Sequence, residues 1–563
     1  MALMTGEQYI QSIKNIRMQV YMFGKKIEDP TEDPILRPSL NSVRMTYAAA
    51  ATPVTTGWAR CAHWRRSSPR CGSYRRTGRP APVRWPCAAA PSGAWLPAYR
   101  RRSLFTSSAE RRSCRPPSSG CWLLKTHKET MPMNWKEHYR SRLTTADEAV
   151  THIKSGDRVV LGHAAGEPTW LTDAMVRHAA AYRGVEIDHM LVLGACAYCR
   201  PEYAESFRHN ALFVSPPARE TVKNGMADFT PTFFYRAPRL FETVLPVDVA
   251  LIQVTPPDEN GICSLGVSVD YTLAAVKNAK TVIAQVNRLM PRTCGGGNIS
   301  VEEIDLFVEH DAPLLELAPP VIGPVEEAIG RCCASLVNDG DTLQLGIGAI
   351  PDAVLSFLHH KRDLGIHSEM FSDGVVDLME RGVINNSRKT LHRGVSVANF
   401  LMGTQRLYDF VNSNPQVEVY PVEHVNDPVV IAQNDNMVCI NSCIQVDLMG
   451  QVVSESVGLR QISGVGGQVD FVRGAAMSKN GRSIMAMPST VRGRASKIVP
   501  VLDHGSAVTT SRNDVDYVVT EYGIAHLTGR TLRQRARALI EIAHPDFRGQ
   551  LREAYEQRFH QAY

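Results

Sequence analysis

The sequence predicts an α/β fold with two open, mainly parallel sheets that face each other across a cleft. From about residue 133 onward, apolar runs of strand length alternate with segments of helical spacing, and this alternation is typical of parallel sheets. It occurs in two successive series that meet near Pro320. No run reaches the ~18 consecutive apolar residues that a membrane-spanning helix needs.

The two series define the elements that we expect. In the first series the apolar periodicity predicts helices over 134–142, 146–153 and 169–182, and strands within 158–161, 185–194, 211–215, 247–266 and 280–287. In the second series it predicts helices over 324–337 and 351–360, and strands near 342–345, 366–370, 416–420, 437–441 and 498–502. Thr145 precedes the helix at 146 with the spacing of a capping box.

Four segments follow from these patterns and from shifts in composition. We expect an N-terminal fragment over 1–50, an Arg-, Pro- and Cys-rich stretch over 51–132, and α/β domains over 133–320 and 321–563. The first two segments form an extension that we expect to be disordered, because 51–121 has no helical or strand period and too little apolar surface to offset chain entropy.

The composition of 51–121 allows three interpretations. The stretch holds 14 Arg, no Lys, one acidic residue and five Cys. It is a disordered basic arm for nucleic acid or membrane, a zinc site, or the out-of-frame translation of GC-rich DNA that joins two genes. Its Cys spacings match no paired CxxC pattern, and the third interpretation explains the Arg, Pro, Cys and Trp excess best. The 14 Arg and one Glu contribute +13 to the net charge of +6, so the rest of the chain carries −7, which argues against a nucleic-acid-binding body.

One stretch of the second domain combines the features of a binding site. The apolar run 342–345 leads into the glycine turn Gly346–Ile350, and Pro351 is expected at the first position of the next helix. A second short run carries Glu369 at its tip. Ligands of open α/β sheets bind at the carboxyl ends of strands, and amide groups at a helix N-terminus favour anions. The stretch therefore predicts an anion site beside one carboxylate.

Four ordered motifs in this chain resemble those of the acetyl-CoA hydrolase/transferase family, and within it the 4-hydroxybutyrate and butyryl-CoA:acetate CoA-transferases. They are GIGAIPDAV (346–354), HSEMFSDGVVDL (367–378), SGVGGQVDFVRGA (463–475) and VTTSRNDVDYVVTEYGIAHLTGR (508–530). The resemblance covers about 134–563, whereas residues 1–47 resemble the extreme N-terminus of the 4-hydroxybutyryl-CoA dehydratases. The metal and flavin ligands of that second family lie beyond the matched block.

The resemblance implies a CoA-transferase with the corresponding two-domain fold. It would move coenzyme A between a short-chain acyl-CoA, such as acetyl-CoA or butyryl-CoA, and a carboxylic acid such as 4-hydroxybutyrate. The reaction would be ping-pong through a glutamyl-CoA thioester. An acyl-CoA hydrolase that uses the same glutamate is the main alternative, and a nucleic-acid-binding protein that uses the basic arm is a distant one.

The resemblance also implies the catalytic residues. Glu369 matches the nucleophilic glutamate, backbone amides of Ile347 and Gly467 match the oxyanion donors, and Asn426 matches the residue that positions the reacting carbonyl. Each has an ordinary structural alternative: an ion-paired Glu, a turn Asn before Asp-Pro, and glycines needed for positive φ. The GVGG run lacks the spacing of a dinucleotide motif.

Coenzyme A is expected as a substrate, with no permanently bound cofactor. The resemblance places it along Gly346, Ile347, Gly348, Ala349, Ile350, Ile444, Gly466 and Gly467. The partners would be small molecules and further copies of the chain, in a homodimer or higher homo-oligomer. We expect neither nucleic acid nor membrane as a partner, and a cytoplasmic location, because the N-terminus lacks the apolar core of a signal peptide.

Cysteine and histidine patterns predict no metal site. Cys196 and Cys199 form a lone CxxC that could be redox-active or half of a metal site, but no second pair has a fitting spacing, so we expect buried thiols. His359, His360 and His367 could suggest metal ligation, although solvated histidines at helix ends are the simpler interpretation.

Overall fold

The structure is a computed structural model that describes residues 20–22, 25–27 and 134–563. The chain divides into two compact units, 1–122 and 123–563. In the first unit, β1 (Val20–Met22) pairs antiparallel with β2 (Lys25–Ile27). The predicted disorder of 51–132 lies outside the described residues. Among the helices that are described, none is both long and apolar enough to cross a membrane.

The first sheet of the second unit has seven strands, all parallel, in the order β12-β9-β7-β3-β4-β5-β6. Its strands are β3 (Arg158–Leu161), β4 (Val185–His189), β5 (Phe207–Ala211), β6 (Asp228–Phe229), β7 (Val249–Val254), β9 (Thr281–Val286) and β12 (Leu306–Glu309). Every residue of β7 is buried, as expected for a parallel strand that is covered on both faces.

Short helices connect these strands. They are α4 (Trp135–Ser141), α5 (Ala146–Ala149), α6 (Thr169–Arg177), α7 (Arg219–Lys223), α8 (Ala237–Thr243) and α9 (Thr272–Asn278). The hydroxyl of Thr145 accepts a hydrogen bond from the Glu148 amide, so the predicted cap at the start of α5 is present.

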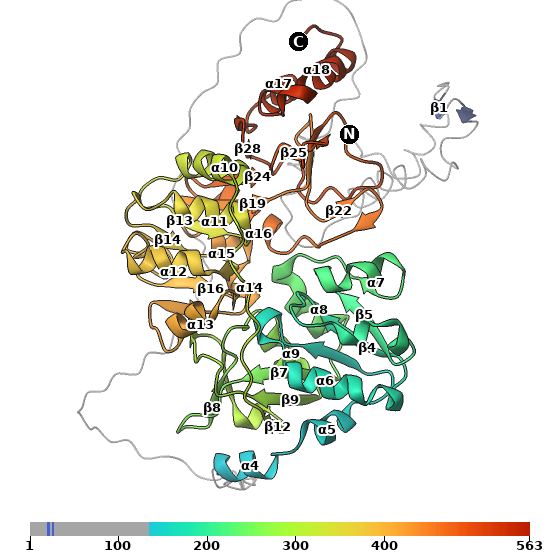
Figure 1. Ribbon diagram of the computed structural model, residues 1–563, viewed down its shortest axis with the longest axis vertical. Helices are drawn as coiled ribbons and strands as arrows, with labels where there is room; N and C mark the ends of the chain where they lie inside the picture. Colours follow the sequence, from blue (N-terminus) through green and yellow to red (C-terminus); the bar gives the residue numbers. More distant parts are fainter. Residues whose placement is uncertain (1–19, 23–24, 28–133) are drawn as a thin grey trace, which may run out of the picture. The chain divides into compact units, whose positions relative to one another are not determined.

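The second sheet has six strands in the order β14-β13-β19-β24-β28-β29. They are β13 (Thr342–Leu345), β14 (Gly365–Ile366), β19 (Met437–Ser442), β24 (Arg482–Ala486), β28 (Tyr517–Thr520) and β29 (Gly523–His526). Only β29 at the edge runs antiparallel to its neighbour in this sheet. Figure 1 shows the two sheets as distinct parts of the chain, the first in blue-green to yellow-green and the second in yellow to red. The predicted α/β class with two mainly parallel sheets is confirmed.

The helices of the second half are longer on average. They are α10 (Pro324–Ser335), α11 (Ala349–Ser356), α12 (Asp373–Glu380), α13 (Gln405–Val411), α14 (Val422–Val425), α15 (Pro428–Ile431), α16 (Gln468–Met477), α17 (Leu532–Glu541) and α18 (Pro545–Phe559). Pro351 occupies the third position of α11 rather than the predicted first, because Gly348 is the N-cap. The backbone N–H groups at both positions have no intrahelical partner, so the proline ring at Pro351 removes no hydrogen bond from the helix.

One of three small sheets joins the two halves. The pair β8 (Ile262–Ser264) and β11 (Asn298–Ser300) lies in the first half, and the pair β15 (Met370–Phe371) and β17 (Phe400–Leu401) lies in the second. The third sheet is the triplet β10 (Cys294–Gly295), β18 (Val417–Val419) and β16 (Ser396–Ala398). The triplet pairs β10 of the first half with β18 of the second. Gly295 makes this approach possible, since a Cβ there would lie 2.5 Å from the Val419 carbonyl oxygen. One buried apolar cluster extends over both halves.

The remaining short strands lie in the C-terminal half. They are β20 (Gln445–Asp447), β21 (Val452–Val453), β22 (Ser456–Val457), β23 (Arg460–Gln461), β25 (Thr490–Val491), β26 (Ala495–Ser496) and β27 (Ile498–Val499).

Two predicted strands differ from the structure. The apolar run 211–215 was expected to be a strand, but β5 ends at Ala211 and contains the polar residues Arg208 and Asn210. Both polar side chains have partners within the sheet, because Arg208 forms an ion pair with Asp228 and the Asn210 amide donates a hydrogen bond to Asp188. The predicted strand 366–370 is two strands in different sheets, β14 and β15, with Glu369 immediately before the second.

Candidate active site

Glu369 lies where the chain leaves the six-stranded sheet and enters the small β15–β17 sheet. Its carbonyl oxygen accepts hydrogen bonds from the amides of Asn399 (3.1 Å) and Phe400 (3.3 Å). Its backbone is therefore held at two points, at the edge where the carboxyl ends of β13 and β14 meet the first half of the chain. This is the edge where open α/β sheets bind ligands.

A chain of side-chain amides orients the Glu369 carboxylate. The Asn426 amide donates to Glu369 Oε2 over 2.8 Å, and the Asn399 amide donates to Asn426 Oδ1 over 2.7 Å. Asn426 caps the C-terminus of α14 and is fully buried. The Asn399 bond fixes which way the Asn426 amide faces, so its N–H₂ group points to Glu369 and toward Asp470, 3.4 Å away.

Two glycines allow the backbone to reach the same carboxylate. Gly467 is the N-cap of α16, and its backbone amide acts to lower the pKa of Glu369. A Cβ on Gly467 would lie 1.7 Å from Glu369 Oε2 and 2.3 Å from Asn426 Nδ2, so no side chain fits there. Gly466 has φ +54°, in the left-handed region that favours glycine. The structure thus brings together Glu369, Asn426, Gly466 and Gly467.

Two carboxyl groups of this site, those of Glu369 and Asp470, have raised pKa values. Burial raises the pKa of Glu369 to about 7, against the opposing effects of the Asn426 hydrogen bond and of nearby His163. Burial also raises the pKa of Asp470 well above its usual range, and repulsion from Glu369 adds to it. Both carboxyl groups therefore hold a proton more tightly than an exposed carboxyl group does.

Glu369 borders a cavity of about 150 Å³ between the two halves of the chain. The first half contributes apolar side chains and one histidine, and the second half contributes the glycine turns and several amides. The residues that line it include His163, Phe213, Phe234, Gln344, Ile347, Asn441, Gly466 and Gln468. Gln344 on β13 and Asn441 on β19 hydrogen-bond to each other through their side chains (3.0 and 3.2 Å).

His163 presents a free ring nitrogen to this cavity. Its Nδ1 lies 3.1 Å from Asp270 Oδ2, whereas its buried Nε2 has no hydrogen-bond partner among the described residues. Asp270 is held in turn by the Ser268 hydroxyl at 2.8 Å. A carboxylate on Nδ1 fixes the tautomer that carries a proton there, so Nε2 is available to a ligand in the cavity.

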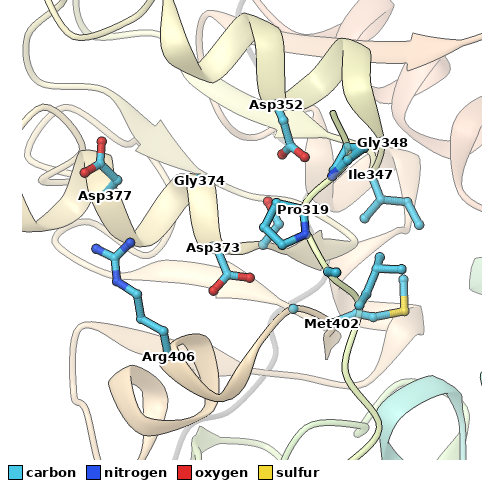
Figure 2. Close-up of a pocket in the computed structure, with 14 residues that line it drawn as sticks. Pro319, Ile347, Gly348, Asp352, Asp373, Gly374, Asp377, Met402 and Arg406 are labelled. Carbon is cyan, nitrogen blue, oxygen red and sulfur yellow. The ribbon is translucent and has the colours of Figure 1, made fainter. Parts of the chain in front are cut away.

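The glycine turn after β13 separates this cavity from a larger one of about 420 Å³. Figure 2 shows Ile347 and Gly348 on the turn at one side of the larger cavity, with Asp352 on the helix above them. Ile347 borders both cavities, and Gly346 borders the smaller one. Ala349 and Ile350 form the first turn of α11 and border neither, because Ile350 packs into the core.

Ile444 lies apart from these residues. It follows β19 and borders a different cavity, which Arg494 and Lys497 also line. Asn441, three residues earlier, is the residue from this segment that faces the Glu369 cavity. A contact of Ile444 with coenzyme A stays a prediction.

Sequence reasoning missed the residues around the cavity that are not part of a motif. His163, Gln344 and Asn441 each carried a signal, because each is a polar residue at the carboxyl end of, or just after, an otherwise apolar strand. Asn399 and Asp470 carried none, since their role depends on contacts with residues far away in the sequence.

The predicted histidines are placed differently from one another. His359 and His360 are exposed, as expected, but His367 is fully buried, and its Nε2 donates to the Val425 carbonyl (2.8 Å). The solvated placement predicted for His367 is wrong, because that residue precedes Glu369 inside the sheet rather than at a helix end. In the part of the chain that the structure describes, none of the three belongs to a cluster that could hold a metal.

Three family models match parts of this chain. The models of the acetyl-CoA hydrolase/transferase N-terminal and C-terminal domains match residues 127–318 and 403–555. A third model, the N-terminal region of 4-hydroxyphenylacetate 3-hydroxylase, matches residues 5–66. The N-terminal block therefore resembles a different family from the body, while its likeness to the dehydratases stays a prediction.

Three relatives cover most of the body. The chain is 61% identical to 4-hydroxybutyrate coenzyme A transferase of Clostridium kluyveri, over 76% of this chain and 100% of that protein. It is 48% identical to succinyl-CoA:cyclohexane-1-carboxylate CoA transferase of Geobacter metallireducens, over 75% and 96%. The crystal structure of 4-hydroxybutyrate CoA-transferase from Porphyromonas gingivalis is 46% identical, with a TM-score of 0.66 over 76% of this chain and 100% of that one. This chain therefore belongs to the acetyl-CoA hydrolase/transferase family and is an enzyme of the CoA-transferase type.

Proposed function

We propose that this enzyme transfers coenzyme A from a short-chain acyl-CoA to a carboxylic acid such as 4-hydroxybutyrate, through a glutamyl-CoA thioester on Glu369. The observation that carries the proposal is the setting of one carboxylate. Glu369 faces a small cavity, the Asn426 amide donates a hydrogen bond to its carboxylate, and the backbone of Gly467 lies beside the same carboxylate. An ionised carboxylate needs no general base to attack a thioester, so this arrangement suffices for the first step.

The chemistry takes two displacements in each direction. A Glu369 oxygen forms a bond to the acyl carbonyl carbon, and the C–S bond breaks, which gives a mixed anhydride and the thiolate of coenzyme A. The thiolate then attacks the Glu369 carbonyl carbon, and the acyl carboxylate leaves. An incoming acid reverses both steps, so that Glu369 ends as a free carboxylate and the new acid holds the thioester.

Each displacement passes through a tetrahedral oxyanion that needs donors. The Gly467 amide and the Asn426 side chain already lie beside the Glu369 carboxylate, and the Ile347 amide is the donor that we assign to the acyl carbonyl, since Ile347 borders the same cavity. One such donor typically contributes ~3 kcal/mol to the transition state.

Coenzyme A acts here as a substrate, and the glycine turn is the place we assign to its thiol end. Ile347 borders both the Glu369 cavity and the larger cavity beside Asp352 and Asp373 (Figure 2). Those carboxylates disfavour phosphate groups in the larger cavity. It therefore suits the uncharged pantetheine arm better than the diphosphate.

The size and lining of the smaller cavity support a short acid. Phe213, Phe234 and other apolar side chains suit an alkyl chain, and the unpartnered His163 Nε2 can bond to a terminal hydroxyl. The two 4-hydroxybutyrate CoA-transferases among the relatives support 4-hydroxybutyrate as that acid. We expect the enzyme to act in the cytoplasm as a homo-oligomer.

Acid-dependent exchange of coenzyme A tests the proposal. Purified enzyme with butyryl-CoA and 4-hydroxybutyrate should form 4-hydroxybutyryl-CoA, with parallel lines in double-reciprocal plots, as ping-pong kinetics require. Free coenzyme A should not accumulate when the acid is omitted. Steady release of coenzyme A without acid would instead make the enzyme a hydrolase, and intersecting lines would argue against a covalent intermediate.

A further inference from the structure

A cluster of sulfur and nitrogen donors lies in the first half of the chain, outside the catalytic cavity. Cys196 is the N-cap of a single helical turn, Ala197–Cys199, that follows β4 and ends with Cys199, and His209 lies on the neighbouring strand β5 (Figure 1). The two Sγ atoms and a ring nitrogen of His209 all lie within 4.8 Å of one another. The sequence alone showed only a CxxC pair, because the third donor comes from a different strand.

The distances within the cluster suit one small ion. Cys199 Sγ lies 3.4 Å from His209 Nδ1. Two ligands of a tetrahedral zinc ion, at the usual Zn–S and Zn–N lengths, are about 3.6 Å apart. Cys196 adopts the left-handed conformation at φ 49°, which non-glycine residues rarely adopt. That turn brings its side chain back toward Cys199.

The surrounding hydrogen bonds prepare His209 as a ligand. Its Nε2 lies 3.2 Å from the His189 carbonyl oxygen, which can only accept, so Nε2 carries the proton and Nδ1 offers its lone pair to the cysteines. A carbonyl on the second ring nitrogen is the usual support of a metal-bound histidine.

A zinc ion would replace both thiol protons, which leave to solvent. Two thiolates and Zn²⁺ have no net charge, so the occupied site avoids the penalty of an isolated buried ion.

We propose that Cys196, Cys199 and His209 bind one Zn²⁺ ion. The fourth position belongs to a water molecule on the side of Cys199, which is partly exposed, whereas Cys196 and His209 are buried. The ion would link the carboxyl ends of β4 and β5. The chain segments that follow these strands carry Leu191 and Phe213, which line one wall of the Glu369 cavity, so the ion would brace that wall rather than take part in the reaction.

Zinc and cobalt titrations of the full chain test this site without relying on activity. The reduced protein is first stripped of metal with a chelator. It should then bind about one tight equivalent of Zn²⁺ more than Cys199→Ser or His209→Gln does, and release about two protons per ion. Co²⁺ should give thiolate charge-transfer absorption in the wild type and lose it in both variants. Zn²⁺ should also raise the melting temperature of the stripped wild type by several degrees and leave that of the variants unchanged.

Cys443→Ser is the matched control, because Cys443 is also a buried free thiol and belongs to no metal cluster among the described residues. It should keep the wild-type zinc stoichiometry. If a variant fails to fold, the effect of Zn²⁺ on the melting temperature of the wild type still tests the proposal. Equal zinc content in the wild type and both variants would overturn the proposal, as would a stripped wild type that neither binds Co²⁺ through thiolate nor melts higher with Zn²⁺.

Discussion

Glu369 and Glu167 are two glutamates whose pKa values rise alike and whose surroundings differ. Burial is the main reason that the pKa of each rises to about 7. Glu167 follows β3 in the first half of the chain, and Glu369 follows β14 in the second. The pKa alone therefore does not distinguish the glutamate that we propose as the nucleophile from Glu167.

The difference lies in what each carboxylate touches. Glu167 accepts the Gly194 amide at 3.0 Å and packs so closely that a Cβ on Gly194 would lie 2.6 Å from its Oε1. Glu369 has donors on one side and the cavity on the other. A nucleophile needs both a free edge and donors that can follow the developing charge, and of these two residues only Glu369 has both.

The largest expected effect follows from replacing each glutamate by glutamine. Glu369→Gln should lower kcat by at least about 10⁴-fold, as the loss of a nucleophile does in other enzymes. Glu167→Gln should keep kcat within a few-fold. Steady-state rates with butyryl-CoA and 4-hydroxybutyrate measure both, with Glu418→Gln as a control outside the cavity. If kcat falls by a comparable factor in the Glu167 and Glu369 variants, the proposed difference in role between the two glutamates is wrong.

The donors to Glu369 should show the next largest effect. Asn426→Ala removes the 2.8 Å bond to Oε2 and should lower kcat by about 10²- to 10³-fold. Asn399→Ala only frees the Asn426 amide to rotate, so this variant should lose less of the wild-type kcat than Asn426→Ala does. Rates of the two variants under saturating substrates compare them. If Asn426→Ala keeps nearly full activity, the amide is structural.

The two glutamates should behave alike in stability. Folding raises the pKa of each from 4.5 to about 7, so the folded state holds the proton more tightly than the unfolded chain. The penalty for ionisation is absent below about pH 4.5 and complete above about pH 7, where it reaches at most about 3 kcal/mol for each group. Either glutamine variant should then be more stable than the wild type at pH 8 and no more stable at pH 4, in denaturant melts.

The same ionisation predicts the pH profile of catalysis. Only the carboxylate form of Glu369 attacks, so kcat/KM for acyl-CoA should fall below about pH 7. Glu167→Gln should keep that profile. A profile that is flat down to pH 5 would mean that another group limits the reaction.

The smallest effect is expected for the N-terminal extension. A chain that begins at Met133 should keep kcat and melt at a similar temperature, because the relative from Clostridium kluyveri is matched over its full length by 76% of this chain. It should lose any salt-sensitive binding of nucleic acid. Loss of folding on this deletion would show that the extension is part of the enzyme.

The fold was predictable where a strand is apolar throughout. β3 and β13 agree with the predicted ranges, since both are buried strands with sharp turns at their ends. β5 was misplaced because its polar residues pair with partners on neighbouring strands, and β24 and β28 were not predicted at all. Their assignment depends on tertiary pairing, which local patterns do not contain.

The site was predictable only where a motif carries it. Glu369, Asn426 and Gly467 come from three segments of the sequence that carry motifs of the family, and the structure brings them together around one carboxylate. The cavity residues His163 and Gln344, and the supporting Asn399, come from single positions without a motif. The contact between Cys199 and His209 likewise needs the register of β4 against β5.

The covalent intermediate is the central claim, and intact-protein mass spectrometry tests it most directly. Wild-type enzyme incubated with butyryl-CoA and no acid should gain the mass of coenzyme A less one water. Hydroxylamine should remove the adduct, and peptide mapping should place it on Glu369. Glu369→Gln should gain nothing, whereas Glu167→Gln should gain the same mass as the wild type. An adduct on any other residue, or an active wild type that shows none, would contradict the account.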